Sequence, residues 1–294
     1  MKTTFVNFKA EDGVKLQGLL FEPNIKGNTI IIHIHGMAGS FYENSFITSM
    51  AELYSSNNVA FLSFNNRGHD YIADIVKITP DGTESVLGGA AYEIIEESLL
   101  DIEGAISFVK ELGYDRIVLQ GHSSGANKIA YSYSIKQLDA IGVALLSPCD
   151  DLGILIDEVG EKRNEYLKLA DTLISDGKPE AFMPEDTFFS YLLSAKTYKD
   201  SFCDNSALDA FPYRDENNDF SMFKKISVPI LITFGNDGDY LLQPHETIKQ
   251  LLNEKKSPDA SLDFEVIEGA SHSYSGKETI LAETILQWMN KLDG

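Results

Sequence analysis

The sequence has 294 residues, of which 43% are hydrophobic and 23% charged, as in an ordinary globular protein with one large domain or a domain carrying an insertion. With 24 basic against 45 acidic residues the formal net charge is −21, which argues against nucleic acids and anionic membranes as partners because these are negative themselves. The two cysteines form no C-x-x-C pair, and the first segment lacks the apolar stretch of a signal peptide. No apolar run approaches the roughly 20 residues of a membrane helix. These features predict a cytoplasmic setting and no membrane partner.

The first third of the chain predicts mainly strands. The expected elements are strands over residues 4–9, 14–21, 29–34 and 59–64, a helix over residues 43–56, and a long loop over residues 71–89. The first two strands alternate apolar and polar residues around Glu11-Asp12-Gly13, which predicts an antiparallel hairpin. The next two are nearly continuous apolar runs, which is typical of strands buried on both faces of a sheet.

The rest of the chain alternates strands and helices, with one long interruption. The expected elements are a helix over 92–112, a strand over 115–120, a helix over 126–135 and a strand over 141–146, then strands over 229–234 and 262–267 with helices over 246–252 and 278–291. This alternation predicts an α/β fold with a mostly parallel, twisted eight-stranded sheet, an N-terminal antiparallel hairpin and helices on both faces. Residues 150–227 show helical and aromatic-rich stretches but no strand. They are the expected helical cap, inserted into a core domain of residues 1–149 and 228–294.

The segment Gly121-His122-Ser123-Ser124-Gly125 lies between a predicted strand and a predicted helix. In that context G-x-S-x-G indicates a nucleophile elbow, a sharp turn that lifts a serine hydroxyl clear of the sheet. The two glycines let strand and helix approach closely while the serine takes a strained backbone conformation. Ser123 is therefore the predicted nucleophile.

A serine hydroxyl needs a base that takes its proton and an acid that orients the base. His272 lies in the loop between the last strand and the last helix, at the sheet edge where Ser123 also emerges, and is the predicted base. Two acids compete in the loop after the strand over 229–234. Asp239 is favoured because an apolar pair and a proline opening a helix follow it, and Asp237, nearer the strand end, is the alternative acid.

Acyl transfer also needs two backbone N–H donors for the developing negative oxygen. Ser124, at the start of the elbow helix, is predicted to supply one of them. The small-residue loop over residues 35–39 is predicted to supply the other, which we assign to Met37. Gly36 and His122, beside these donors, are the predicted substrate-binding residues.

Five motifs of the chain resemble, in the same order, those of the α/β-hydrolase superfamily: HGMAG (35–39), NNRGHD (65–70), GHSSG (121–125), GNDGDY (235–240) and GASHS (269–273). The resemblance covers nearly the whole chain and implies a serine, a histidine and an aspartate acting together. Family members usually carry the acid at the position of Gly238, which both aspartates flank. The cap resembles that of small-capped bacterial carboxylesterases, including those that act on hydroxycinnamoyl esters.

Three further patterns have alternative interpretations. His33 and His35 share a strand face and suggest a metal pair, but no cysteine or carboxylate lies near them in sequence, so packing is favoured and no metal is predicted. Arg67 could bind a substrate anion, although a structural ion pair under its loop is favoured. The many aromatic residues of the cap either form the cap's own core or line an apolar substrate pocket.

The sequence thus predicts a serine hydrolase that cleaves carboxylic esters of a small molecule through an acyl-enzyme, without a cofactor. Thioesters and peptide or amide bonds are alternatives, since the same three side chains cleave all of them. A ligand-binding protein that keeps the fold without turnover is the alternative from another class. The oligomeric state is not predicted.

Overall fold

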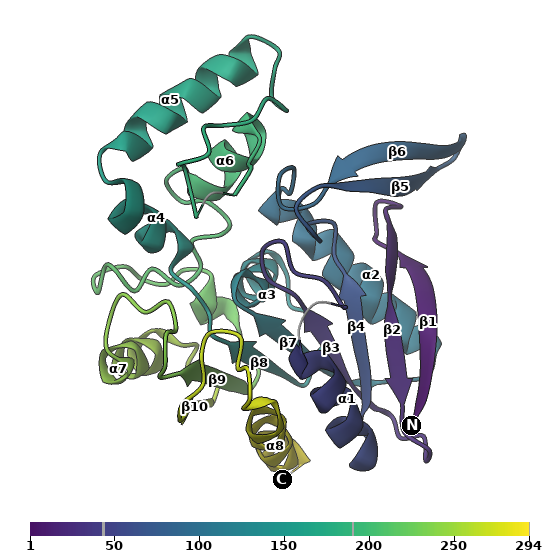
Figure 1. Cartoon of the computed structure of the whole chain (residues 1–294). Helices are drawn as coiled ribbons and strands as arrows, with labels where there is room; N and C mark the ends of the chain where they lie inside the picture. The colour runs from purple at the N-terminus through teal and green to yellow at the C-terminus, as the bar shows by residue number, and fades with distance from the viewer. Residues whose placement is uncertain (43–44, 190, 294) are drawn as a thin grey trace.

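A computed structural model describes residues 1–42, 45–189 and 191–293. Eight strands form one twisted sheet in the order β1-β2-β4-β3-β7-β8-β9-β10 (Figure 1). In chain order they are β1 (Lys2–Lys9), β2 (Lys15–Glu22), β3 (Thr29–Ile34), β4 (Ala60–Asn65), β7 (Arg116–His122), β8 (Gly142–Leu146), β9 (Ile230–Gly235) and β10 (Leu262–Ile267). The pairs β1–β2 and β2–β4 are antiparallel and the other neighbouring pairs are parallel. The predicted eight-stranded α/β fold with its N-terminal hairpin is confirmed.

Helices cover both faces of the sheet, which explains why its central strands are apolar along their whole length (Figure 1). One face carries α1 (Ser45–Ser56) and α8 (Glu278–Met289), and the other carries α2 (Ser98–Glu111), α3 (Ser124–Ile135) and α7 (His245–Lys255). The helix expected over 43–56 is present from Ser45, and residues 43 and 44 lie outside the described residues. The helix expected from residue 92 begins only at Ser98, after a 3-10 turn, η1 (Ile95–Glu97). Glu93, just before that turn, points inward to pair with Lys128 of α3.

The prediction of a long loop over residues 71–89 is wrong, because most of this segment is a two-stranded hairpin. Its strands are β5 (Ala73–Thr79) and β6 (Gly82–Gly88), joined at Pro80-Asp81. One face of the hairpin packs on the core through Ile75, whereas Val76 and Ile78 of the same strand are exposed. A strand with apolar residues on both faces lacks the clean alternation that identifies a half-buried strand, so the pattern did not show it.

Between β8 and β9 the chain leaves the sheet for the segment that we call the insert, residues 150–227. It carries α4 (Asp151–Val159), α5 (Lys162–Ser175), α6 (Ala195–Phe202) and a 3-10 turn, η2 (Phe223–Lys225), and α4, α5 and α6 lie beyond the carboxyl ends of the strands (Figure 1). The three helices share a hydrophobic cluster of their own, which includes Leu155 and Phe202. Apolar residues of the range 210–226, in contrast, pack into the hydrophobic cluster between the sheet and the helices α2, α3 and α7. The cap boundaries therefore remain a prediction.

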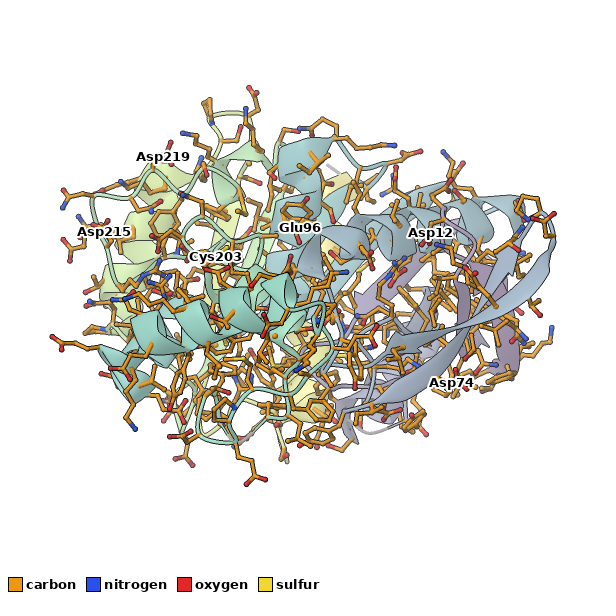
Figure 2. All side chains as sticks on the ribbon, turned by 90° about the horizontal axis from the view of Figure 1, so that it is seen from above. Asp12, Asp74, Glu96, Cys203, Asp215 and Asp219 are labelled. Carbon is orange, nitrogen blue, oxygen red and sulfur yellow. The ribbon has the colours of Figure 1, made fainter. Side chains whose placement is uncertain are left out.

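The acidic surplus is spread over the molecule. Figure 2 places Asp12 and Asp74 at one end of the protein and Asp215 and Asp219 at the other. Such a distribution favours solubility over attraction of one localised partner. Within the described ranges, no helix combines the length and apolar character needed to cross a membrane.

Candidate active site

A cavity of about 480 Å³ opens at the carboxyl ends of the strands, beneath the insert. Its core lining comes from the loops that follow β3, β4, β7, β8, β9 and β10, and the insert adds Asp151, Ile154, Phe188, Phe189 and Tyr191. In α/β proteins this edge of the sheet is where ligands bind, and the volume suits a small organic molecule. Ser123 and His272 both line this cavity.

Ser123 occupies the sharp turn between β7 and α3 with φ 56° and ψ −132°, a conformation that L-residues rarely adopt. The turn is possible because Gly125 has no side chain, since a Cβ there would lie 2.2 Å from the carbonyl oxygen of Ile34. The Ser123 hydroxyl is 3.8 Å from the Cys149 sulfur. Among the described residues, no hydrogen bond joins this hydroxyl to His272.

His272 pairs with Asp239 and not with Asp237. The Nδ1 atom of His272 is 2.6 Å from Oδ1 of Asp239. Asp237 is exposed, and its backbone amide donates to the carbonyl of Ala270 instead. The structure thus places Ser123 and His272 at one cavity, with Asp239 bonded to His272, and leaves Asp237 outside.

Asp239 is held as a carboxylate. Its second oxygen accepts hydrogen bonds from the Ser147 hydroxyl at 2.6 Å and from the Gly235 amide at 2.9 Å. Burial works to raise the pKa of Asp239, but the bonds from His272 and Ser147 outweigh it, so the pKa lies below the ordinary value of an aspartate. The carboxylate therefore keeps its negative charge next to the imidazole at neutral pH.

Ser147 belongs to a longer chain of hydroxyl groups. The Ser147 oxygen is 2.8 Å from the Tyr274 phenol, and that phenol is 2.8 Å from the hydroxyl of Thr233. Because a carboxylate only accepts, Ser147 donates to Asp239, and because a backbone carbonyl only accepts, the Tyr274 phenol donates to the carbonyl of Thr233 at 3.0 Å. The sequence interpretation missed Ser147 and Tyr274, although Ser147 directly follows β8 and Tyr274 lies two residues after His272.

The two predicted oxyanion donors have free amides. Neither the Met37 nor the Ser124 backbone N–H takes part in a hydrogen bond within the part of the chain that the structure describes. Met37 lines the cavity, whereas Ser124 is buried and is not one of the lining residues. Gly36 also lines the cavity, and a Cβ at this position would lie 2.9 Å from Cβ of Ser123. Only glycine lets the β3 loop come this close to the serine.

His122 lines the cavity, but its hydrogen bond goes to the protein. Its Nε2 atom is 2.8 Å from the backbone carbonyl of His272, to which it donates. Burial lowers the pKa of His122 to about 3, so the ring is neutral over the ordinary pH range. The predicted substrate-binding residue thus fixes the loop that carries His272.

His33 and His35 are both occupied by protein partners. His33 accepts a hydrogen bond at Nδ1 from Gln120 at 2.9 Å, and His35 donates to the Gly36 carbonyl and accepts from the amide of Asn66. No cluster of three or more possible metal ligands exists among the residues described. The two histidines support the loops around the cavity by packing and hydrogen bonding.

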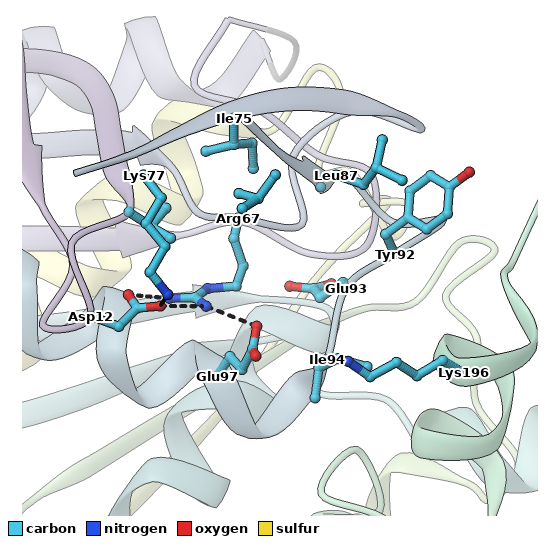
Figure 3. A pocket seen from close by; sticks show the side chains of 13 residues that line it. Asp12, Arg67, Ile75, Lys77, Leu87, Tyr92, Glu93, Ile94, Glu97 and Lys196 are labelled. Carbon is cyan, nitrogen blue, oxygen red and sulfur yellow. Dashed lines mark hydrogen bonds and ion pairs between the residues drawn. The ribbon is translucent and has the colours of Figure 1, made fainter. Parts of the chain in front are cut away.

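Arg67 is buried in a structural network away from the cavity of Ser123. Its guanidinium pairs with Asp12 at 3.0 Å, with Glu97 at 2.8 Å and with the fully buried Asp101 at 2.8 Å. Figure 3 shows this network lining a separate small cavity below the β5–β6 hairpin, where Lys77 also reaches Asp12. With three carboxylates around it, Arg67 has no spare bonding capacity for a substrate anion.

The insert aromatics divide between the two roles that were left open. Tyr198 and Phe202 are buried in the insert's own cluster. Phe189, Tyr191 and the more deeply buried Phe188 line the cavity. Phe188, Phe189 and Tyr191 therefore supply most of the aromatic lining.

The arrangement of sheet, elbow and insert is that of an α/β hydrolase. Among solved structures, the chain is similar to Est1E from Butyrivibrio proteoclasticus with bound ferulic acid, with 18% identity over 97% of this chain and 98% of that chain and a TM-score of 0.65. It is also similar to the siderophore hydrolase EstB from Aspergillus fumigatus, with 12% identity over 94% and 95% of the two chains and a TM-score of 0.67. An esterase from Pyrococcus furiosus matches with 16% identity over 99% and 91% and a TM-score of 0.60. At these low sequence identities the likeness shows a shared fold and nothing more.

Residues 78–290 match the family model described as a protein of unknown function, DUF1749, and the chain belongs to this family. No curated protein matches the sequence.

Proposed function

We propose that this protein is a serine hydrolase that cleaves carboxylic esters of small molecules. The observation that carries the proposal is the Asp239–His272 pair, because His272 lines the same cavity as the strained Ser123. An aspartate on Nδ1 of a histidine fixes the tautomer whose Nε2 can accept a proton, which is what a serine nucleophile needs. The fold neighbours include proteins titled esterases, one of them with ferulic acid bound, which agrees with an ester substrate.

In the proposed reaction the Ser123 oxygen attacks the ester carbonyl carbon and its proton passes to Nε2 of His272. The carbonyl electrons move onto the oxygen, which the amides of Met37 and Ser124 stabilise. Collapse of this intermediate breaks the bond to the alcohol, which leaves with the proton from His272. Water then attacks the acyl-enzyme while His272 takes its proton, and collapse of the second intermediate returns this proton from His272 to the Ser123 oxygen and releases the acid. No cofactor takes part.

One movement precedes the chemistry. The Ser123 hydroxyl lies towards Cys149, so it has to turn about its single side-chain torsion to donate to His272. Catalytic hydrogen bonds often tighten only when substrate is bound. We also propose that residues 150–227 act as the cap that covers the acyl-enzyme, because α4, Phe188, Phe189 and Tyr191 line the cavity.

The proposal is tested by labelling with a fluorophosphonate and by turnover of p-nitrophenyl esters. Wild type should be labelled on Ser123 and turn over at least one ester, and Ser123→Ala should lose labelling and about 10⁴-fold or more of kcat. Ser134→Ala is the matched control, because this serine ends the same helix α3 and bonds to the carbonyl of Tyr131. Labelling without turnover of any ester, thioester or amide would favour a ligand-binding protein instead.

A further inference from the structure

Besides Asp239, which pairs with His272, four carboxyl side chains are almost fully buried in the described residues, and one of the four differs from the others. Glu93 pairs with Lys128 at 2.6 Å, Asp101 with Arg67 at 2.8 Å, and Asp150 with Arg214. Asp151 is only 6% exposed, yet no lysine, arginine or histidine among the described residues forms an ion pair with it. Asp151 thus lacks the cation that the other three carboxyl groups possess. Burying a carboxylate without such a partner costs folding free energy.

Asp151 is also the one of these four that lines the cavity of Ser123. It is the first residue of α4, and its Oδ2 atom accepts a hydrogen bond from Nδ2 of Asn127 at 3.1 Å. Asn127 lies one turn along the elbow helix from Ser123 and also donates to the carbonyls of Cys149 and Leu208. The carboxyl group is therefore held in place by the same helix that carries the nucleophile.

The nearby cations are already occupied. Lys128 is fully buried against Glu93, and Arg214 is shared by Asp150 and Asp209. Burial, together with Asp150 and Asp209, raises the pKa of Asp151 to about 8 despite the opposing effect of Lys128. Without a ligand the group thus carries a proton at neutral pH. A cation in the cavity would stabilise the carboxylate, and that proton would leave to water.

The aromatic side chains that line the cavity suit a cation as well. Tyr71, Phe189, Tyr191 and Tyr240 line the cavity. The Tyr71 and Tyr191 rings are stacked with their centroids 5.5 Å apart, and the Phe189 and Tyr240 rings are tilted with theirs 5.4 Å apart. Aromatic faces attract ammonium groups, and more strongly when the contact is desolvated. A chain with a net charge of −21 disfavours anions over the whole surface.

We propose that the ester cleaved at Ser123 carries an ammonium group, and that Asp151 is the residue that selects it. This inference rests on the proposed function and names the substrate class of the same site. Asp151 then acts in specificity and takes no part in proton transfer to or from Ser123. The substrate supplies the partner that the protein itself does not provide.

The experiment compares three matched p-nitrophenyl esters, those of 6-aminohexanoate, 6-hydroxyhexanoate and heptanoate, which differ in one terminal group. A second series places the same groups on the alcohol, in butyrate esters of 3-aminopropanol, 1,3-propanediol and butanol, followed by release of butyrate. In at least one series, the kcat/KM of wild type for the ammonium ester should be about tenfold or more higher than its kcat/KM for either neutral ester. Preference for a neutral ester, or none, in both series would overturn the inference while leaving the proposed function intact.

Two variants separate the carboxylate from the general charge of the insert. Asp151→Asn should reduce the ammonium preference to within about threefold while turnover of the neutral esters persists. Asp157→Asn removes an exposed charge from the same helix and should keep the wild-type preference. An unchanged preference in Asp151→Asn would assign the selectivity to the rings instead and overturn the role of Asp151. If wild type cleaves no ester and Ser123 is not labelled, the proposed function fails and this inference fails with it.

Discussion

The carboxyl edge of the sheet and the insert above it are held together in different ways. At the edge, buried polar groups are paired side chain to side chain, as in the bonds that join Asp239 to His272 and to Ser147. In the helical part of the insert the ion pairs lie outside, and Asp204, which pairs with Arg163, is 84% exposed. There the interior is an apolar and aromatic cluster. The edge is thus held by hydrogen bonds between fixed partners, whereas the helical part of the insert is held by apolar packing.

The largest expected difference lies between the two aspartates of one loop. Asp239→Asn should reduce kcat by about 10⁴-fold, because the amide can donate to Nδ1 and hold the wrong imidazole tautomer. Asp237→Asn should stay within about threefold of wild type, since its side chain is exposed. Steady-state kinetics on one p-nitrophenyl ester measure both, and equal losses would mean that the loop rearranges in solution.

The second test compares ion pairs of the two regions by urea unfolding. Arg67→Met leaves Asp101 buried without its cation and should reduce the free energy of unfolding by about 3–5 kcal/mol. Asp204→Asn breaks an exposed pair of the insert and should change it by less than about 1 kcal/mol. A large effect of Asp204→Asn would show that the insert also depends on its charges.

A third test uses pH. The pKa of Asp151 in the folded protein, about 8, lies above its ordinary value of 3.8, so the folded state binds this proton more tightly than the unfolded chain. The stabilisation is complete below the ordinary pKa and is lost as the pH rises towards 8. Between pH 6 and 7.5, wild type should therefore lose about 2 kcal/mol of unfolding free energy relative to Asp151→Asn. Urea titrations at both pH values measure this, with Asp157→Asn expected to follow wild type.

The smallest expected effect concerns two buried tyrosines. Tyr274→Phe interrupts the hydroxyl chain behind Asp239 and should lower kcat about tenfold, the equivalent of one hydrogen bond. Tyr198→Phe in the insert removes a phenol that has no hydrogen-bond partner among the described residues, so stability and kcat should hold or improve slightly. A larger loss of kcat in Tyr198→Phe than in Tyr274→Phe would contradict this comparison between the carboxyl edge and the insert.

The sequence predicted the sheet well because its central strands are continuous apolar runs, such as Thr29–Ile34, that no other element explains. The hairpin β5–β6 escaped prediction because apolar residues lie on both of its faces, and its inner face is defined only by contact with the core. The loop sequence favoured Asp239 but left Asp237 open, because the usual position of the acid is Gly238, which both aspartates flank. The fold of that loop decides which one reaches His272.

The sequence by itself determined the strands of the main sheet and the helices between them, the elbow at Ser123 and the candidate histidine, since each depends on residues that are neighbours in the chain. Tertiary structure alone decided which acid meets His272, which hydroxyls stand behind that acid, and which buried carboxyl lacks a cation. These depend on side chains brought together from distant segments, such as Asp151 and Asn127, and local pattern carries no information about them.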